Sequence, residues 1–122
     1  MIEEGFILFE FRKDLFKIQF DNGLTVSLNC GIGHYSPNYS GELQNRQFIE
    51  LPTVEVEIYK GSLFRKHVNP IRFANSLEIH NLGTTSSTIA GYVKPDKVAE
   101  LIYNISRLSK EEVKTIVNED NK

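Results

Sequence analysis

Cysteine is almost absent from this sequence of 122 residues, and its scarcity excludes one class of protein. The single cysteine, Cys30, cannot form a disulfide within the chain, so a disulfide framework is excluded and a reducing compartment is favoured. Cys30 lies in phase with the apolar residues that precede it, which favours a buried, inert thiol over a reactive one. We therefore expect a cytoplasmic protein with one hydrophobic core, folded as a single domain over residues 1–122.

An excess of positive charge is also missing. Lysine and arginine together number 14 against 16 aspartate and glutamate residues, which gives a formal net charge of −2. Proteins that bind nucleic-acid polymers usually carry a basic excess that neutralises phosphates. We therefore expect no nucleic-acid polymer as a partner.

Long apolar runs and catalytic signatures are missing as well. No apolar stretch approaches the roughly 20 residues that a membrane span needs, and the N-terminal MIEEGFILFEF lacks the basic region of a signal peptide. Neither a G-x-S-x-G nor a Walker A motif is present. His34, His67 and His80 have no ligand-like neighbours at zinc-site spacing. We therefore expect no membrane partner, no metal, no cofactor and no catalytic residue.

The clearest pattern that is present is a β-hairpin over residues 15–30. Apolar and polar residues alternate on both sides of the turn sequence Asp-Asn-Gly. A two-residue turn would set apolar side chains opposite polar ones, whereas a three-residue loop pairs Phe20 with Leu24 and keeps each face uniform. We therefore predict a three-residue loop with Gly23 in the left-handed position of a G1 bulge.

Further strands follow the hairpin. Residues 53–60 alternate valine and isoleucine with Glu55, Glu57 and Tyr59, which we interpret as a solvated strand face, with a functional carboxylate pair as the alternative. Weaker patterns predict strands beginning at residue 63, near residues 77–81 and over residues 88–93, and the polar stretch 83–87 is expected to be a turn.

Two helices are predicted at the C-terminal end. Lys-Pro-Asp at 94–96 begins the first, because proline suits the first helical position. Ser109 followed by Glu112 is a capping box that begins the second, and residues 118–122 are expected to fray. Strands first and helices last predict an α+β fold, in which N-terminal hairpins form an antiparallel β-sheet and two C-terminal α-helices follow.

One segment predicts an additional covering surface. Residues 6–11 are apolar on both parities, so as a strand they would be covered on both faces, either by a helix of the same chain or by a partner subunit. Tyr92 lies on the opposite face of its strand from Ile89 and Val93, and is another candidate contact. We therefore expect a homo-oligomer.

The segment 31–52 has no periodic pattern, and such long irregular loops are often functional. Gly31 and Gly33 could expose consecutive N–H groups that bind an anion, or they could form a bulge that ends the strand. Tyr35 could stack on a base, or it could pack the loop onto the core.

Three arginines are candidates for binding phosphate. Arg65 and Arg72 lie in a segment that interleaves basic and aromatic residues, which suits a nucleotide, although an ordinary basic surface loop is the alternative. Arg107 lies late in the first helix, where the helix dipole already favours a cation.

Three stretches resemble small proteins encoded by bacteriophages: NGLTVSLNCGIGHYS, VEVEIY and AGYVKPDKVAELI. The resemblance covers roughly residues 16–105, and the order of sheet first and two helices last is similar to that of the Thoeris anti-defence sponges. The resemblance implies a protein that binds a cyclic ADP-ribose-type nucleotide without cleaving it, in a pocket at a subunit interface.

These observations lead to a hypothesis and two alternatives. The hypothesis is a non-catalytic counter-defence protein that sequesters a cyclic nucleotide. The first alternative is a module that docks on a host protein through a sheet edge or through residues 31–52; the second is an enzyme acting on a small molecule. The chemistry of the residues suggests six ligand-binding positions: Gly31, Gly33, Tyr35, Arg65, Arg72 and Arg107.

Overall fold

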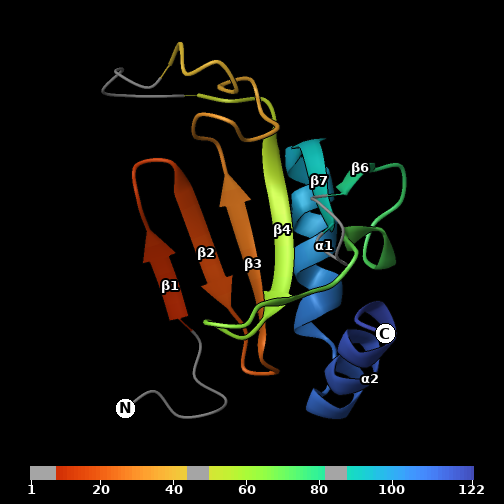
Figure 1. The fold of residues 1–122 in the computed structure, drawn as a ribbon. Helices are drawn as coiled ribbons and strands as arrows, with labels where there is room; N and C mark the ends of the chain where they lie inside the picture. The colour runs from red at the N-terminus through yellow and green to blue at the C-terminus, as the bar shows by residue number, and fades with distance from the viewer. Residues whose placement is uncertain (1–7, 44–49, 82–87) are drawn as a thin grey trace.

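An antiparallel β-sheet and two α-helices make up the computed structural model, which describes residues 8–43, 50–81 and 88–122 (Figure 1). The predicted α+β class is confirmed. A short 3₁₀ turn, Pro70–Arg72, lies between the fifth and sixth strands. The strands are β1 (Leu8–Phe11), β2 (Leu15–Gln19), β3 (Leu24–Asn29), β4 (Val54–Lys60), β5 (Lys66–His67), β6 (Glu78–Asn81) and β7 (Thr88–Val93), and the helices are α1 (Pro95–Ser106) and α2 (Lys110–Asp120).

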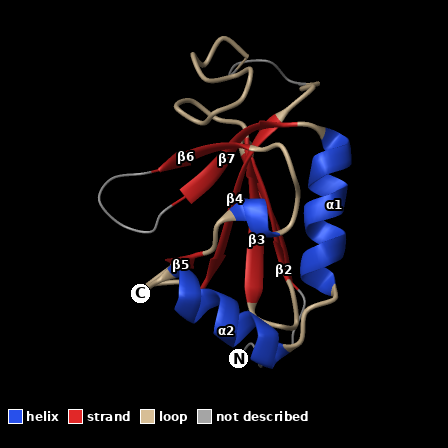
Figure 2. Cartoon of the chain, turned by 90° about the vertical axis from the view of Figure 1, so that its right-hand side faces the viewer, coloured by secondary structure: helices blue, strands red, loops and turns tan. Residues whose placement is uncertain are grey.

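The strands lie in the order β1-β2-β3-β4-β7-β6, and β5 also pairs with the end of β4. Every pairing in the described part of the chain is antiparallel. Both helices pack on one face of this sheet, with α1 running along it and α2 crossing below (Figure 2). The other face has no helix over it in the described residues, and it is the face that positions the candidate site.

The hydrophobic core lies between the sheet and the two helices. Inward side chains of β3 and β4 meet Leu101 and Ile105 of α1, and Val113 and Val117 of α2. Each of these aliphatic side chains is almost completely buried, and burial of one such side chain contributes about 1.5–3 kcal/mol. The amphipathic stripes of both helices therefore account for their position on the sheet.

The register predicted for the hairpin over residues 15–30, which is β2 and β3, is confirmed. Phe16 pairs with Leu28, and Ile18 pairs with Val26. The Phe20 amide donates to the Leu24 carbonyl at 2.9 Å, and Gly23 has a φ of +98°. The turn is therefore the three-residue loop that uniform faces require.

A buried asparagine fastens this turn to the end of α1. The Nδ2 of Asn22 donates to the carbonyl of Ile105 at 2.8 Å and to that of Leu108 at 3.1 Å, while its Oδ1 accepts from the Leu24 amide at 3.1 Å. Ile105 lies in the last turn of α1 and Leu108 in the link that follows the helix, so this side chain joins the turn of the hairpin to the end of the helix.

The second helix begins as predicted and continues further than expected. Ser109 and Glu112 exchange side-chain and backbone hydrogen bonds as a capping box, and these bonds lower the pKa of Glu112. At the other end, Asp120 accepts from the Asn69 amide at 2.9 Å and from Arg72. These contacts keep α2 helical to Asp120, beyond residue 118 where we expected fraying to begin.

Two apolar segments are more exposed than the sequence pattern predicts. Leu63 and Phe64 do not form a strand; they lie at the tip of the turn between β4 and β5, with 89% and 88% of their surfaces exposed. Phe9 and Phe11 of β1 are 56% and 74% exposed, so neither helix of the chain covers them. Residues 6–7 and 83–87, where parts of the predicted strand and turn fall, lie outside the described residues.

Candidate functional site

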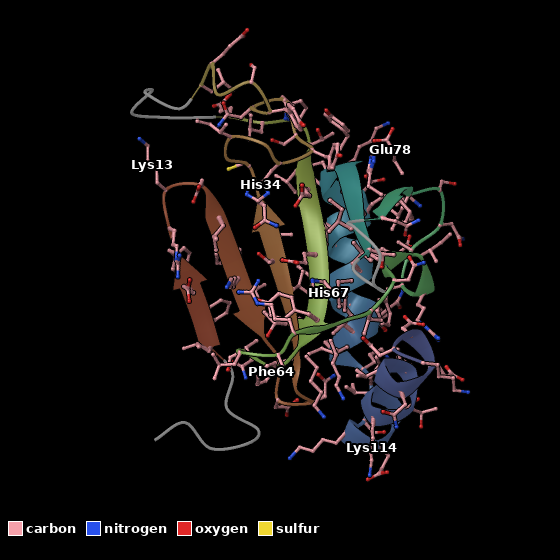
Figure 3. All side chains as sticks on the ribbon, in the orientation of Figure 1. Lys13, His34, Phe64, His67, Glu78 and Lys114 are labelled. Carbon is pink, nitrogen blue, oxygen red and sulfur yellow. The ribbon has the colours of Figure 1, made fainter. Side chains whose placement is uncertain are left out.

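The candidate site lies on the face of the sheet opposite the helices. Polar side chains of β3 and β4 point to this side, but Glu55 and Tyr59 are only 5% and 3% exposed. The solvated strand face that we predicted for residues 53–60 is therefore wrong. The loop 31–43 contacts Glu55, and residues of the β4–β5 hairpin contact Tyr59, so both ends of the face are covered. Figure 3 shows His34 toward the upper end of this face and His67 nearer the lower end of the face.

The loop 31–43 binds the carboxylate of Glu55, a residue of β4. The Tyr35 amide donates to Glu55 Oε2 at 2.8 Å, and His34 Nδ1 lies 3.1 Å from Glu55 Oε1. Asn29 Nδ2 also donates to Oε1, at 3.3 Å. The buried carboxylate thus has a partner on each oxygen, which is what a buried charge requires. Glu55 thereby ties the loop to the sheet.

The two glycines of this loop have different surroundings. Gly31 is packed against Asp14, and a Cβ at position 31 would lie 2.7 Å from the Asp14 carboxylate. Gly33 has a φ of +81° and open space beside it, but its N–H donates to the Tyr39 carbonyl at 3.0 Å. Within the described loop, the N–H of Gly33 is therefore engaged by the chain and is not directed at an external anion.

Tyr35 joins two motifs that are far apart in the sequence. The Tyr35 side chain packs directly on Gly91: a Cβ atom added at position 91 would lie 2.9 Å from the Tyr35 Cβ. The Tyr35 carbonyl accepts a hydrogen bond from the Tyr92 amide at 2.9 Å. The Tyr35 ring stacks on His80, with centroids 4.0 Å apart and planes 4° from parallel. Tyr39 and Tyr92 flank the same ring. One face of Tyr35 is therefore covered by His80, and a partly exposed aromatic cluster surrounds it.

Tyr92 is held in an unusual conformation in this cluster. Its φ is +51°, a value that residues with a Cβ rarely adopt, and 44% of its surface is exposed. Such strain occurs most often where neighbouring structure over-determines a residue, and it is often found at functional sites. Here the Tyr92 amide is bound to the Tyr35 carbonyl, and Tyr35 packs on the adjacent Gly91.

Further along the same face, cations and an aromatic ring border a hollow of about 380 Å³. The Arg65 guanidinium lies 4.4 Å from the centre of the Tyr59 ring, and the Lys17 ammonium lies 5.8 Å from it on a different strand. The size is within the range of small-molecule sites. Other residues lining the hollow include Glu10, Gln19, Thr25 and Ser62.

A carboxylate–imidazole pair lies beside this hollow. Glu57 Oε2 and His67 Nε2 are 2.5 Å apart, and Arg65 lies 3.7 Å from the other carboxylate oxygen. Burial alone would raise the pKa of Glu57, but the hydrogen bond from His67 and the surrounding positive charges of His67, Arg65 and Lys17 outweigh it. The pKa of Glu57 is therefore held below its ordinary value of 4.5.

The structure does not bring all six predicted residues together. Gly31, Gly33 and Tyr35 lie where β3 ends, and Arg65 lies at the hollow. The two ends of the face meet β4 at Glu55 and Tyr59, four residues or about 13 Å apart along the strand.

The other two arginines lie elsewhere. Arg72 is bound to Glu119 and Asp120 at the end of α2, and these partners raise its pKa. Arg107 follows α1, where it contacts Tyr103 through a hydrogen bond and a cation–π contact.

Sequence reasoning overlooked Lys17 and Tyr59 as site residues. Both were assigned to the polar side of their strands, and the correct hairpin register already places Lys17 opposite Ser27. Because Ser27 in turn pairs with Glu57 of β4, these side chains share one face. The missing information was the pairing of β3 with β4.

Comparison with protein-family models, with curated proteins and with solved structures gives no match. The site must therefore be interpreted from its own chemistry. Within residues 8–43, 50–81 and 88–122, no three His, Cys, Asp or Glu side chains gather as a metal ion would need. No helix in these ranges has the length and apolar character to span a membrane.

Proposed function

We propose that this protein binds a nucleotide of the cyclic ADP-ribose type without cleaving it, in the hollow on the helix-free face of the sheet. The observation that carries the proposal is the convergence of Lys17 and Arg65 on Tyr59, from β2 and from the β4–β5 hairpin. Two cations suit a pyrophosphate, and a guanidinium plane offers a surface on which a base can stack. Gln19, Thr25 and Ser62 add polar groups that can bind a ribose.

Binding alone is sufficient for the function that this chemistry supports. A protein in excess over its dissociation constant lowers the free concentration of a signal by mass action, and no acid, base or nucleophile is needed. The resemblance to bacteriophage anti-defence sponges supports the same proposal. We therefore propose that the protein acts as a counter-defence sponge in the cytoplasm of a host cell.

The test is calorimetric titration of the purified protein with cyclic ADP-ribose isomers and cyclic dinucleotides, followed by chromatography of the ligand recovered after denaturation. We expect binding and recovery of the intact nucleotide. Recovery of a cleaved product would instead assign an enzyme, with Glu57 and His67 as the first residues to examine. Absence of heat with every nucleotide would reject the proposal.

Matched variants locate the site. Arg65→Ala and Lys17→Ala should each weaken binding about tenfold or more, because each removes a charged hydrogen-bond donor from the hollow. Arg107→Ala removes the same charge at the end of α1 and should leave the affinity unchanged. Tyr35→Ala tests whether a bound ligand extends to the loop end of the face, and an effect as large as that of Arg65→Ala would place Tyr35 in the site. If Arg65→Ala binds like the unaltered protein, the hollow is not the site.

We also propose that a second copy of the chain covers the exposed aromatic side of β1. Phe9, Phe11 and Phe16 form one cluster of rings there, and β1 is an edge strand in the described sheet. Exposed aromatic clusters of this kind mark interaction surfaces. Phe11→Ser should convert an oligomer into a monomer in sedimentation equilibrium. A monomeric unaltered protein would favour the alternative function, in which this edge docks on a host protein.

A further inference from the structure

A second hollow, of about 510 Å³, lies between the turn after β4 and helix α2. Phe64 from the turn and Lys114 from the helix both line it, toward the lower end of the molecule in Figure 3. Val117, which is only 4% exposed, contributes an apolar side chain from the helix. We call this feature the lysine groove; its lining residues are Lys60, Gly61, Phe64, Lys66, Lys114, Val117 and Asn118.

The turn after β4, which borders the groove, holds the side chain of Phe64 in solvent. Gly61 has a φ of +94°, and a Cβ at this position would lie 2.8 Å from the Phe64 carbonyl oxygen. Only glycine allows the backbone of Phe64 to approach so closely. The tight turn leaves Leu63 and Phe64 almost entirely exposed to solvent at the rim. Two adjacent, large apolar side chains with so little protein contact have no role in the core.

Three lysines around the groove have no acidic partner among the residues that the structure describes. Lys60 and Lys66 face each other directly across the β4–β5 ladder, an arrangement in which like charges repel. Lys114 adds a third ammonium group from α2. In the described ranges, none of the three lies within ion-pair distance of a carboxylate. The acidic side chains at the end of α2 do not neutralise them, because Arg72 binds both Glu119 and Asp120.

We propose that the lysine groove docks an acidic peptide segment of a partner protein, with a large apolar side chain of that segment packed against Phe64. The charges favour carboxylates, and the exposed Phe64 favours an apolar anchor between them. A peptide fits better than a lipid surface because the cations come from two separate elements that border a hollow. A flat surface would meet the projecting tip at Leu63 first.

This surface is separate from the proposed nucleotide site. Arg65 lines the nucleotide hollow, whereas the next residue, Lys66 at the start of β5, lines the groove. Among the described residues, only Gly61 borders both. The chain could therefore hold a small anionic ligand on one side of the β4–β5 hairpin and a peptide on the other, and each activity can be removed without the other.

The test is selection of a displayed library of random dodecapeptides on the full chain, followed by fluorescence anisotropy with the enriched peptides. We expect the enriched sequences to combine two or more Asp or Glu residues with one aromatic or leucine residue. Phe64→Ser, and the double variant Lys66→Glu/Lys114→Glu, should each weaken binding about tenfold or more. The double variant should regain affinity for a peptide in which lysine replaces each acidic residue.

The matched control is Lys13→Glu/Lys94→Glu, which makes the same charge change at two exposed lysines outside the groove and should bind like the unaltered protein. All substituted side chains are exposed, and circular dichroism checks that each variant folds. Failure to enrich any peptide, enrichment of peptides without acidic residues, or equal affinity for Phe64→Ser would overturn the proposal. Binding to phosphatidylserine-rich vesicles that depends on Phe64, without any enriched peptide, would assign the surface to a membrane and also overturn it. Arg65→Ala should leave peptide binding intact, which separates this test from that of the nucleotide site.

Discussion

Replacing Glu55 with glutamine tests whether one buried carboxylate holds the loop 31–43 on the sheet. Glutamine has nearly the same shape, but it is neutral and one of its oxygens is replaced by an NH₂ group that cannot accept a hydrogen bond. In the structure, Oε2 accepts from the Tyr35 amide, and Oε1 has both Asn29 and His34 as partners. Whichever way the amide is turned, at least one buried donor loses its acceptor.

The expected loss can be estimated from these contacts. A hydrogen bond to a charged group contributes about 1.5–3 kcal/mol, and an unsatisfied buried donor costs about 1–3 kcal/mol. Since glutamine keeps one accepting oxygen, we expect Glu55→Gln to lower the free energy of unfolding by about 2–4 kcal/mol. This is a large fraction of the roughly 5–15 kcal/mol that stabilises a typical domain.

Urea denaturation followed by circular dichroism measures this change, and hydrogen exchange of the amides in residues 31–43 shows whether the loop is released. Glu42→Gln is the matched control, because it makes the same chemical change at an exposed position in the same loop and should alter stability by less than about 0.5 kcal/mol. If Glu55→Gln is as stable as this control and its loop amides exchange at the rate of the unaltered protein, the reasoning about the carboxylate is refuted.

Three further predictions concern individual side chains. Asn22→Ala should lower the free energy of unfolding by about 1–3 kcal/mol in urea denaturation, because the two hydrogen bonds that the buried Asn22 side chain donates to the carbonyls of Ile105 and Leu108 are lost; an unchanged midpoint would contradict this. Because the pKa of Glu57 is lower in the folded protein than its ordinary value of 4.5, ionised Glu57 stabilises the folded state at pH values above 4.5. This stabilisation is lost as the pH falls through the lowered pKa. Glu57→Gln should therefore destabilise the protein at neutral pH and show a flatter decline in acid; equal pH profiles would disprove the assignment. Burial, with a smaller effect of Asp14, raises the pKa of Cys30, so its thiol should react with a disulfide reagent at about pH 8 more slowly in the native protein than in urea. Equal rates would contradict the shift.

Features that depend on neighbouring residues were predictable from the sequence. The register of the β2–β3 hairpin follows from parity, because only a three-residue loop keeps both faces uniform, and the structure confirms it. The start of α1 at Pro95 and the capping box at Ser109 follow from local preferences at helix ends. The α+β class follows from the order of these elements, and it too is confirmed.

Local pattern failed where burial depended on a distant segment. Alternation assigned Glu55 and Tyr59 to the outward side of β4 correctly, but it could not reveal that a loop and a hairpin would cover them. Leu63 and Phe64 were expected to begin a strand, whereas the turn that starts at Gly61 places them in solvent. For Glu55 and Tyr59, the periodicity reports which side a residue faces and contains no information about what lies on that side. For Leu63 and Phe64, two adjacent apolar residues are too short a pattern to establish a strand.

The sequence by itself determined the hairpin of β2 and β3, the starts of both helices and their apolar faces, since each depends on interactions between residues that are close in the sequence. Only the tertiary structure decided which strands adjoin, and with that it placed Lys17 and Arg65 over Tyr59 and packed Tyr35 on Gly91. It also separated Arg72 and Arg107 from the hollow, although their chemistry matched that of Arg65. The physical reason is that the pairing of β3 with β4 and the position of the loop minimise the free energy of the whole packed chain, which no single segment of the sequence encodes.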